Sequence, residues 1–249
     1  MTTWTRHLYE HDPLAIAKGE SNGYSFVHKF GANFAVDNNS EPETVWTGGG
    51  LYPWSALETA QTLYLLSEDD GDTGTVEVQG LDADYNLQTE TVTLTGTTAV
   101  TTSNTFLRVY RMVYTDNGAG NLGDITARVT NGTGTVVAHI KEGLSQTLTC
   151  VYTVPAGKTA YMMVGDFSVQ KNKDAQVLML QRPSGTNNFR IAHMAEVYEN
   201  TYRYDFPIPL PLPEKTDLDI RADNVESNNT RVTCNFTMVL VNNNIQGEP

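Results

Sequence analysis

The sequence predicts an all-β protein whose strands form two antiparallel sheets packed face to face, in a jelly-roll-like sandwich with an irregular N-terminal arm. From about residue 58 onward, short β-rich runs alternate with Gly, Asp, Asn and Pro at intervals of roughly ten residues. No window carries the apolar stripe of an amphipathic helix between a cap and a stop. All three tryptophans precede residue 55, so the Cys-Trp-Cys pattern of immunoglobulin domains is missing, which favours a jelly-roll order.

The final strand-like run shows most clearly why sheets are expected. In it Val232, Cys234 and Phe236 share one face, while Thr233 and Asn235 share the other, so one side meets a core and the other meets water. In chain order, the runs predicted as strands cover residues 59–66, 75–81, 87–94, 105–114, 125–130, 135–140, 146–154, 159–170, 175–181, 189–204, 217–222 and 230–241.

One run, residues 105–114, is apolar on both faces. Such a strand is either central between layers or covered by a second chain, and the pattern leaves both interpretations open.

The first 55 residues have a different texture, so the chain is divided into an N-terminal arm or wrap, 1–55, and a β-sandwich domain, 56–249. Large aromatics are separated here by Gly, Asn and Pro without sustained periodicity. These aromatics must be covered, either by a neighbouring subunit that the segment reaches as an assembly arm or by the domain's own core. They are Trp4, Tyr9, Tyr24, Trp46, Tyr52 and Trp54.

Residues 206–214 carry a proline at every second position, which removes backbone donors and forces an extended, polyproline-like path. This segment cannot be a central strand. Its Ile208, Leu210 and Leu212 either dock on another subunit or are covered by the domain itself, as a connection between sheets, and the second interpretation is favoured.

The composition excludes several kinds of partner. A formal net charge of -13 repels nucleic acid and anionic lipid, so no direct nucleic-acid binding is expected. No apolar stretch approaches the ~20 residues of a membrane span, and no signal-type apolar region opens the chain, so no membrane association is expected.

Catalytic machinery is also not recognisable. The sequence has no nucleophile elbow, phosphate-binding loop or dinucleotide fingerprint. Cys150 and Cys234 lie in strand-like runs and are predicted to be reduced core residues. The acidic stretch 69–74 is predicted to be a hairpin turn, with a calcium loop as the less favoured alternative. We therefore expect no catalytic residues, no metal and no cofactor; glycoside hydrolysis, whose two carboxylates have no fixed spacing, is the hardest activity to exclude.

Two stretches in the first half of the predicted domain carry a resemblance to a known class of proteins. Residues 74–85, GTVEVQGLDADY, and 90–98, ETVTLTGTT, resemble a pattern in virion structural proteins of tailed bacteriophages, particularly those of aquatic and cyanobacterial hosts. Residues 106–112, 121–125 and 152–160 have a similar texture, and the likeness covers roughly residues 60–182. The resemblance implies a non-enzymatic particle protein and carries over no catalytic residues.

Together these observations predict a capsid cement or decoration protein, assembled in the host cytoplasm and located in the virion. Its expected partners are the major capsid protein or other virion proteins, and it is expected to form a dimer or trimer. The alternatives are a tail, neck or baseplate component such as a fibre or adaptor, or a carbohydrate-binding module of the host-recognition apparatus. The residues expected to anchor a partner are Trp4, Tyr9, Trp46, Tyr52, Trp54, Ile208, Leu210 and Leu212, because interface energy concentrates in buried aromatic and apolar side chains.

Overall fold

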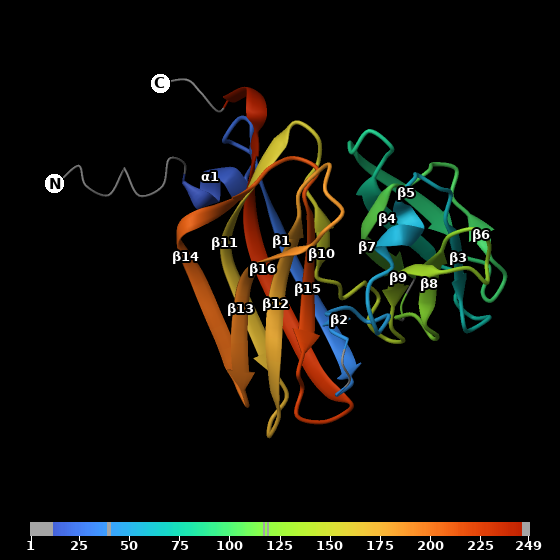
Figure 1. Cartoon of the computed structure of the whole chain (residues 1–249). Helices are drawn as coiled ribbons and strands as arrows, with labels where there is room; N and C mark the ends of the chain where they lie inside the picture. The colour runs from blue at the N-terminus through green and yellow to red at the C-terminus, as the bar shows by residue number, and fades with distance from the viewer. Residues whose placement is uncertain (1–11, 39–40, 117, 119, 246–249) are drawn as a thin grey trace.

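The computed structural model describes residues 12–38, 41–116, 118 and 120–245. Within these ranges the protein is all-β, as predicted, and every strand pairing is antiparallel. The described helical elements are short: α1 (Pro13–Ala17) and the 3-10 turns η2 (Trp54–Leu57) and η3 (Asn243–Ile245). The strands divide between two packed units, which we call the large and the small sandwich (Figure 1).

The large sandwich contains both ends of the described chain. One sheet has the order β1 (Tyr24–Val36), β16 (Thr230–Asn242), β11 (Lys158–Val169), β14 (Thr201–Leu212). The other has the order β10 (Val151–Thr153), β15 (Asp217–Asp223), β12 (Asp174–Arg182), β13 (Arg190–Tyr198), with β2 (Glu43–Thr44) paired to β15. Their inner faces share one core that includes Tyr152, Phe167 and Phe236.

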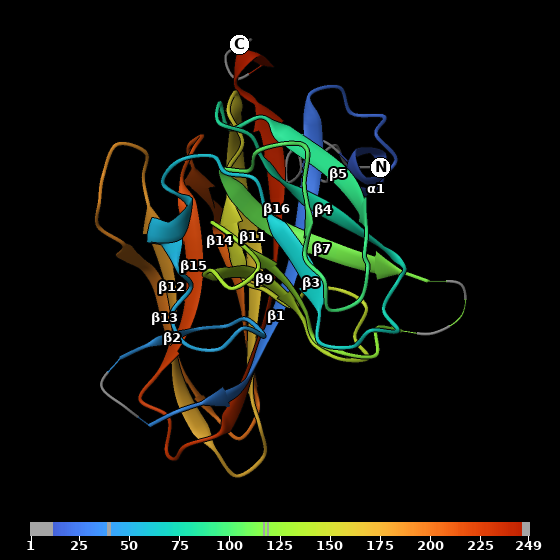
Figure 2. The same cartoon turned by 90° about the vertical axis from the view of Figure 1, so that its right-hand side faces the viewer.

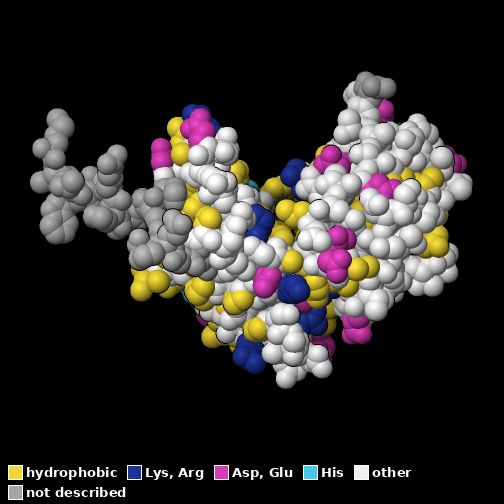
Figure 3. Space-filling model, turned by 90° about the horizontal axis from the view of Figure 1, so that it is seen from above, with side chains coloured by type: hydrophobic (Ala, Val, Ile, Leu, Met, Phe, Trp, Pro, Cys, Tyr) yellow, Lys and Arg dark blue, Asp and Glu magenta, His cyan; other side chains and the backbone are white. Residues whose placement is uncertain are grey.

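The small sandwich is inserted between β2 and β10. Its sheets have the orders β6 (Val100–Thr101), β3 (Tyr64–Ser67), β8 (Ile125–Arg128), β9 (Val136–Ile140), and β5 (Leu87–Thr93), β4 (Thr75–Leu81), β7 (Arg108–Thr115). A separate core, with Phe106, Met112 and Ile125 fully buried, holds them together. Figure 2 shows this unit in front with β1 behind it, and Figure 3 shows the surface hollowed between the two lobes.

Strand β1 lies in a segment where the sequence shows no periodicity. Its core-facing row is set by the register with β16, whose Phe236, Cys234 and Val232 pair with Lys29, Gly31 and Asn33. A lysine, a glycine and an asparagine on the buried row conceal the alternation that normally marks a strand. The described part of 1–55 thus packs on the chain's own core, the second of the two alternatives; whether 1–55 and 56–249 fold as separate units stays a prediction.

Strand β7 is the run that is apolar on both faces, and its position explains why. Val109, Met112 and Tyr114 lie in the core of the small sandwich, whereas Tyr110 packs against the core of the large one. The strand is therefore central between two units of the same chain.

Candidate functional site

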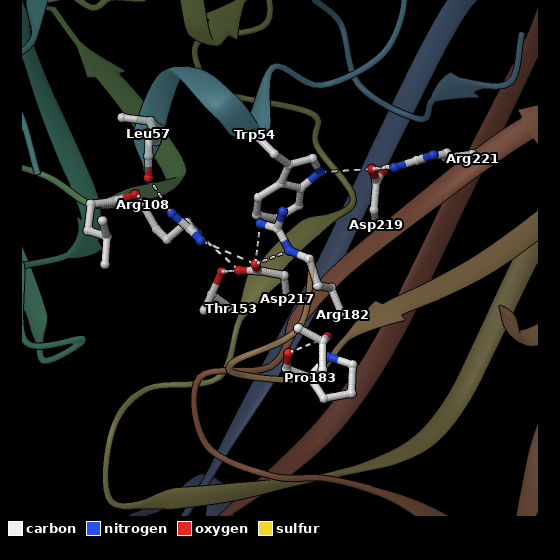
Figure 4. A network of polar contacts seen from close by, with 11 residues as sticks. Trp54, Leu57, Arg108, Thr153, Arg182, Pro183, Asp217, Asp219 and Arg221 are labelled. Atoms are coloured by element: carbon white, nitrogen blue, oxygen red, sulfur yellow. Dashed lines mark hydrogen bonds and ion pairs between the residues drawn. The ribbon is translucent and has the colours of Figure 1, made fainter. Parts of the chain in front are cut away.

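The two sandwiches are joined by a buried ion pair between β7 and β15. The Arg108 Nε lies 3.0 Å from Asp217 Oδ1, and its Nη2 lies 3.2 Å from Asp217 Oδ2, so the guanidinium grips the carboxylate with two parallel bonds (Figure 4). Arg108 Nη1 also donates to the Leu57 carbonyl at 2.6 Å. Both charged side chains are less than a tenth exposed, so water does not compete for these bonds.

Asp217 is shared by further donors from the large sandwich. Arg182 Nη2 lies 2.6 Å from its Oδ2, and the Thr153 hydroxyl donates to its Oδ1 at 2.6 Å. Every oxygen of this buried carboxylate is therefore compensated, which is the condition under which a buried charge is tolerated.

Asp219, two residues further along β15, anchors the segment that crosses between the units. Its carboxylate accepts from Trp54 Nε1 and Thr44 Oγ1, both at 2.9 Å, and pairs with Arg221 at 2.8 Å. Burial raises the pKa of Asp219, an effect that Arg221 and the hydrogen bonds oppose. We call the whole network the joint; its members are Thr44, Trp54, Arg108, Thr153, Arg182, Asp217, Asp219 and Arg221.

The joint explains the aromatics of the N-terminal segment. Trp54 lies 5.3 Å from both the Arg108 and the Arg182 guanidinium, and Tyr52 contacts Trp54 and Trp46 edge to face at 4.9 and 5.2 Å. Trp46, Tyr52 and Trp54 are between 2% and 6% exposed. Residues of this chain therefore cover these three rings, and no partner is needed to bury them. Trp4 and Tyr9 lie outside the described residues.

The proline-rich segment forms the second half of β14, at the free edge of its sheet. Leu212 is fully buried and Leu210 packs against the large core, as expected for a segment covered by its own domain. The segment is not the expected connection between sheets, however, because residues up to Leu212 pair with β11 as an edge strand. Ile208 instead is 84% exposed, in a stretch where the register with β11 shifts. Of the three apolar residues singled out in this segment, Ile208 is thus available to a partner.

Strand β13, the free edge of the other sheet, presents more apolar surface. Ile191, Met194 and Tyr198 are 58%, 52% and 65% exposed. Met194 pairs with Leu178 and Ile191 with Leu180, on the opposite face of β12 from its core residues. We call these three residues together with Ile208 the apolar edge. Ile191, Met194 and Tyr198 were not predicted from the sequence. Glu196 lies on the same face of β13 as Met194 and Tyr198, and this charged residue indicates that the face points outward.

Between the two edge strands, a stack of rings closes the large core. His193 lies 4.4 Å from Tyr204 and contacts Phe167, Tyr202 and Phe206. Its buried Nε2 has no hydrogen-bond partner among the described residues, and burial lowers the pKa of His193. The imidazole is therefore held as a neutral ring in an aromatic environment.

The candidate sites for chemistry have structural roles. The acidic stretch 69–74 is not the predicted hairpin turn, because it connects β3 and β4, which lie in different sheets. Within it Asp72 is buried and accepts hydrogen bonds from Ser67, Leu122 and Gly123, which fix the loop. Cys150 and Cys234 are free and buried, as predicted. Among the described residues no group of three or more His, Cys, Asp or Glu is placed to hold a metal, and no described helix has the length and apolarity needed to cross a membrane.

Comparison with known proteins gives little. No family model and no curated protein matches the chain. Among solved structures, the VP2 subviral particle of infectious bursal disease virus is 8% identical over 98% of this chain and 79% of that chain, with a TM-score of 0.22. The Gt strain of the same virus gives 9% identity over 88% and 75%, with a TM-score of 0.13. Scores this low carry no inference about what this chain does.

Proposed function

We propose that the chain is a non-enzymatic structural protein of a virus particle, and that it acts as a cement or decoration protein on the shell of a tailed phage. The observation that carries the proposal is the apolar edge. Four large side chains, each more than half exposed, lie on β13 and β14, which are edge strands of the two sheets of the large sandwich. Exposed apolar groups gathered on sheet edges are typical of surfaces that other polypeptides cover.

The kind of contact follows from the prolines of β14. Pro207, Pro209 and Pro211 have no backbone N–H, so this edge is poorly suited to adding a further strand. Side chains such as Ile208 and Met194 would instead bind in apolar depressions of a neighbour. The proposed neighbours are the major capsid protein, other virion proteins, or further copies of this chain in a dimer or trimer.

The joint agrees with a role in which the protein holds shell subunits at a fixed distance and angle. A protein that bridges shell subunits has to keep its two lobes in a fixed relation, and buried ion pairs with every group compensated favour one geometry over others. The likeness of residues 60–182 to phage virion proteins agrees with this role, and the net charge of -13 argues against the packaged nucleic acid as a partner.

The proposal is tested on the intact particle. Mass spectrometry of purified virions should detect the chain, and a symmetry-averaged map should place its two lobes on the icosahedral lattice. Density at a single vertex would replace the cement role with a tail or neck role. Absence from purified virions would refute the proposal.

A matched pair of variants tests the apolar edge itself. Met194→Asp with Ile208→Asp should reduce binding to empty shells by at least about tenfold, because two apolar anchors are lost. Leu122→Asp is the control, since Leu122 is 52% exposed on the small sandwich, away from the edge strands. Equal binding by both variants would contradict the assignment of the edge.

A further inference from the structure

A cleft of about 480 Å³ lies between the two sandwiches. One wall is β1, and the other is formed by β4, β5 and β7 of the small sandwich. Phe26 and Leu87, each about half exposed, stand on opposite walls, and Tyr110 and Tyr152 line the cleft further in. Figure 3 shows hydrophobic and basic side chains gathered in the hollow between the lobes.

Lys29 lies in this cleft in an environment that is unusual for a lysine. It occupies the core-facing row of β1, is 7% exposed, and donates from Nζ to the Tyr110 carbonyl. In the described part of the chain Lys29 forms no ion pair. Its ammonium group has three N–H donors but one hydrogen-bond acceptor there, the Tyr110 carbonyl. Burial lowers the pKa of Lys29 to about 7, with a smaller opposing effect of Cys150 and a further lowering by Arg111.

The charges around the cleft favour an anion. The chain has 29 acidic residues, yet none lines the cleft, whereas Lys29 and Arg111 do. Arg111 is exposed and held by Gln146 through a 3.3 Å hydrogen bond, so its guanidinium has further donors to offer. A cationic cleft in an otherwise acidic protein selects ligands of negative charge.

The apolar walls restrict the ligand further. Phe26, Phe30, Tyr110 and Leu87 present rings and a branched chain to the cleft, so a ligand that binds here can bury an apolar body against them. A volume of about 480 Å³ lies within the ordinary range for small-ligand sites. We propose that the cleft binds a monocarboxylate with an apolar or aromatic body, whose oxygens pair with Lys29 and Arg111 and whose body packs against Phe26 and Tyr110. This inference is independent of the proposed particle role.

Isothermal titration with 4-phenylbutyrate, and with its uncharged amide, tests the proposal on the full chain. The carboxylate should bind saturably and at least about tenfold more tightly than the amide, since the amide cannot form the charge-assisted bonds. Lys29→Met should reduce that preference, leaving only the part due to Arg111, and should leave amide binding unchanged. Lys18→Met, at an exposed lysine paired with Glu20, is the control and should bind like the wild type.

Two further measurements test the proposal, one with a second variant and one with a second ligand. Arg111→Gln alters an exposed side chain and should weaken carboxylate binding severalfold even if Lys29→Met failed to fold. A tripeptide ending in phenylalanine, compared with its amide, distinguishes a free carboxylate from the end of another chain as the natural ligand. Equal binding of carboxylate and amide, or no binding of either acid up to ~10 mM, would overturn the proposal.

Discussion

Replacing Lys29 with methionine is expected to stabilise the protein at neutral pH. The pKa of this lysine is lowered from 10.5 to about 7 on folding. Between these values the unfolded chain binds more protons at this site than the folded protein, so stability rises with pH across the window and is lowest below pH 7. A lowered lysine pKa thus means that burial of the ammonium opposes folding at pH 7.

The size of the effect follows from the same two values. At pH 7 the buried ammonium costs about 4 kcal/mol relative to a fully neutral amine. Methionine removes that cost but also the hydrogen bond to the Tyr110 carbonyl, which is worth about 1–2 kcal/mol. Lys29→Met should therefore be more stable by about 2 kcal/mol at pH 7, and the wild type should recover about 2 kcal/mol between pH 7 and 9.

Urea unfolding followed by tryptophan fluorescence at pH 7, 8 and 9 measures both quantities. As the pH rises, the free energy of unfolding of the wild type should increase relative to that of Lys29→Met. Other groups that titrate in this range, including the Cys234 thiol, whose pKa is raised by burial, are common to both proteins and cancel in the comparison. Lys18→Met should follow the wild type. Parallel pH profiles for the wild type and Lys29→Met would refute the assignment of a depressed lysine.

Two further variants test the joint and the ring stack. Asp217→Asn leaves the buried Arg108 and Arg182 guanidinium groups uncompensated and should lower the free energy of unfolding by about 3–5 kcal/mol in urea titrations, whereas Asp205→Asn, at an exposed pair with Arg203, should change it little. Since burial lowers the pKa of His193, the unfolded chain takes up more protons there below about pH 6.5, and the native state loses stability as the pH falls. His193→Phe should reduce that acid-side loss; an unchanged slope between pH 6.5 and 5 would contradict it.

Strand positions were predictable where apolar and polar residues alternate along the chain. The predicted run 75–81 coincides with β4, and 230–241 differs from β16 by a single residue, because in both the inward row is mostly apolar and the outward row polar. Strand β1 escaped prediction because Lys29 and Asn33 stand on its buried row. The partners that make this possible, the Tyr110 carbonyl for Lys29 and Glu43 for Asn33, are brought close by tertiary structure and not by local pattern.

The residues of the joint, the apolar edge and the cleft were only partly predictable. The aromatic content of residues 46–54 correctly indicated that these side chains must be covered, but composition cannot tell a neighbouring molecule from the chain's own second half. Trp54 bonds to Asp219, 165 residues away, a relation with no local signature. Ile208 stood out because its proline-rich surroundings exclude a central strand, whereas the cleft around Lys29 is formed only where β1 of the large sandwich lies against β4, β5 and β7 of the small one.

The insertion of one sandwich into the other has a consequence for biosynthesis. Strand β1 is made before the small sandwich but pairs with β16, which is made after it, so Tyr24 cannot pair until Val241 has left the ribosome. The strands of the small sandwich, by contrast, all lie between residues 64 and 140 and find their partners within that stretch. During translation the inserted lobe can close before β16 has been made, so the nascent chain carries an unpaired β1 edge until residues 230–242 have left the ribosome.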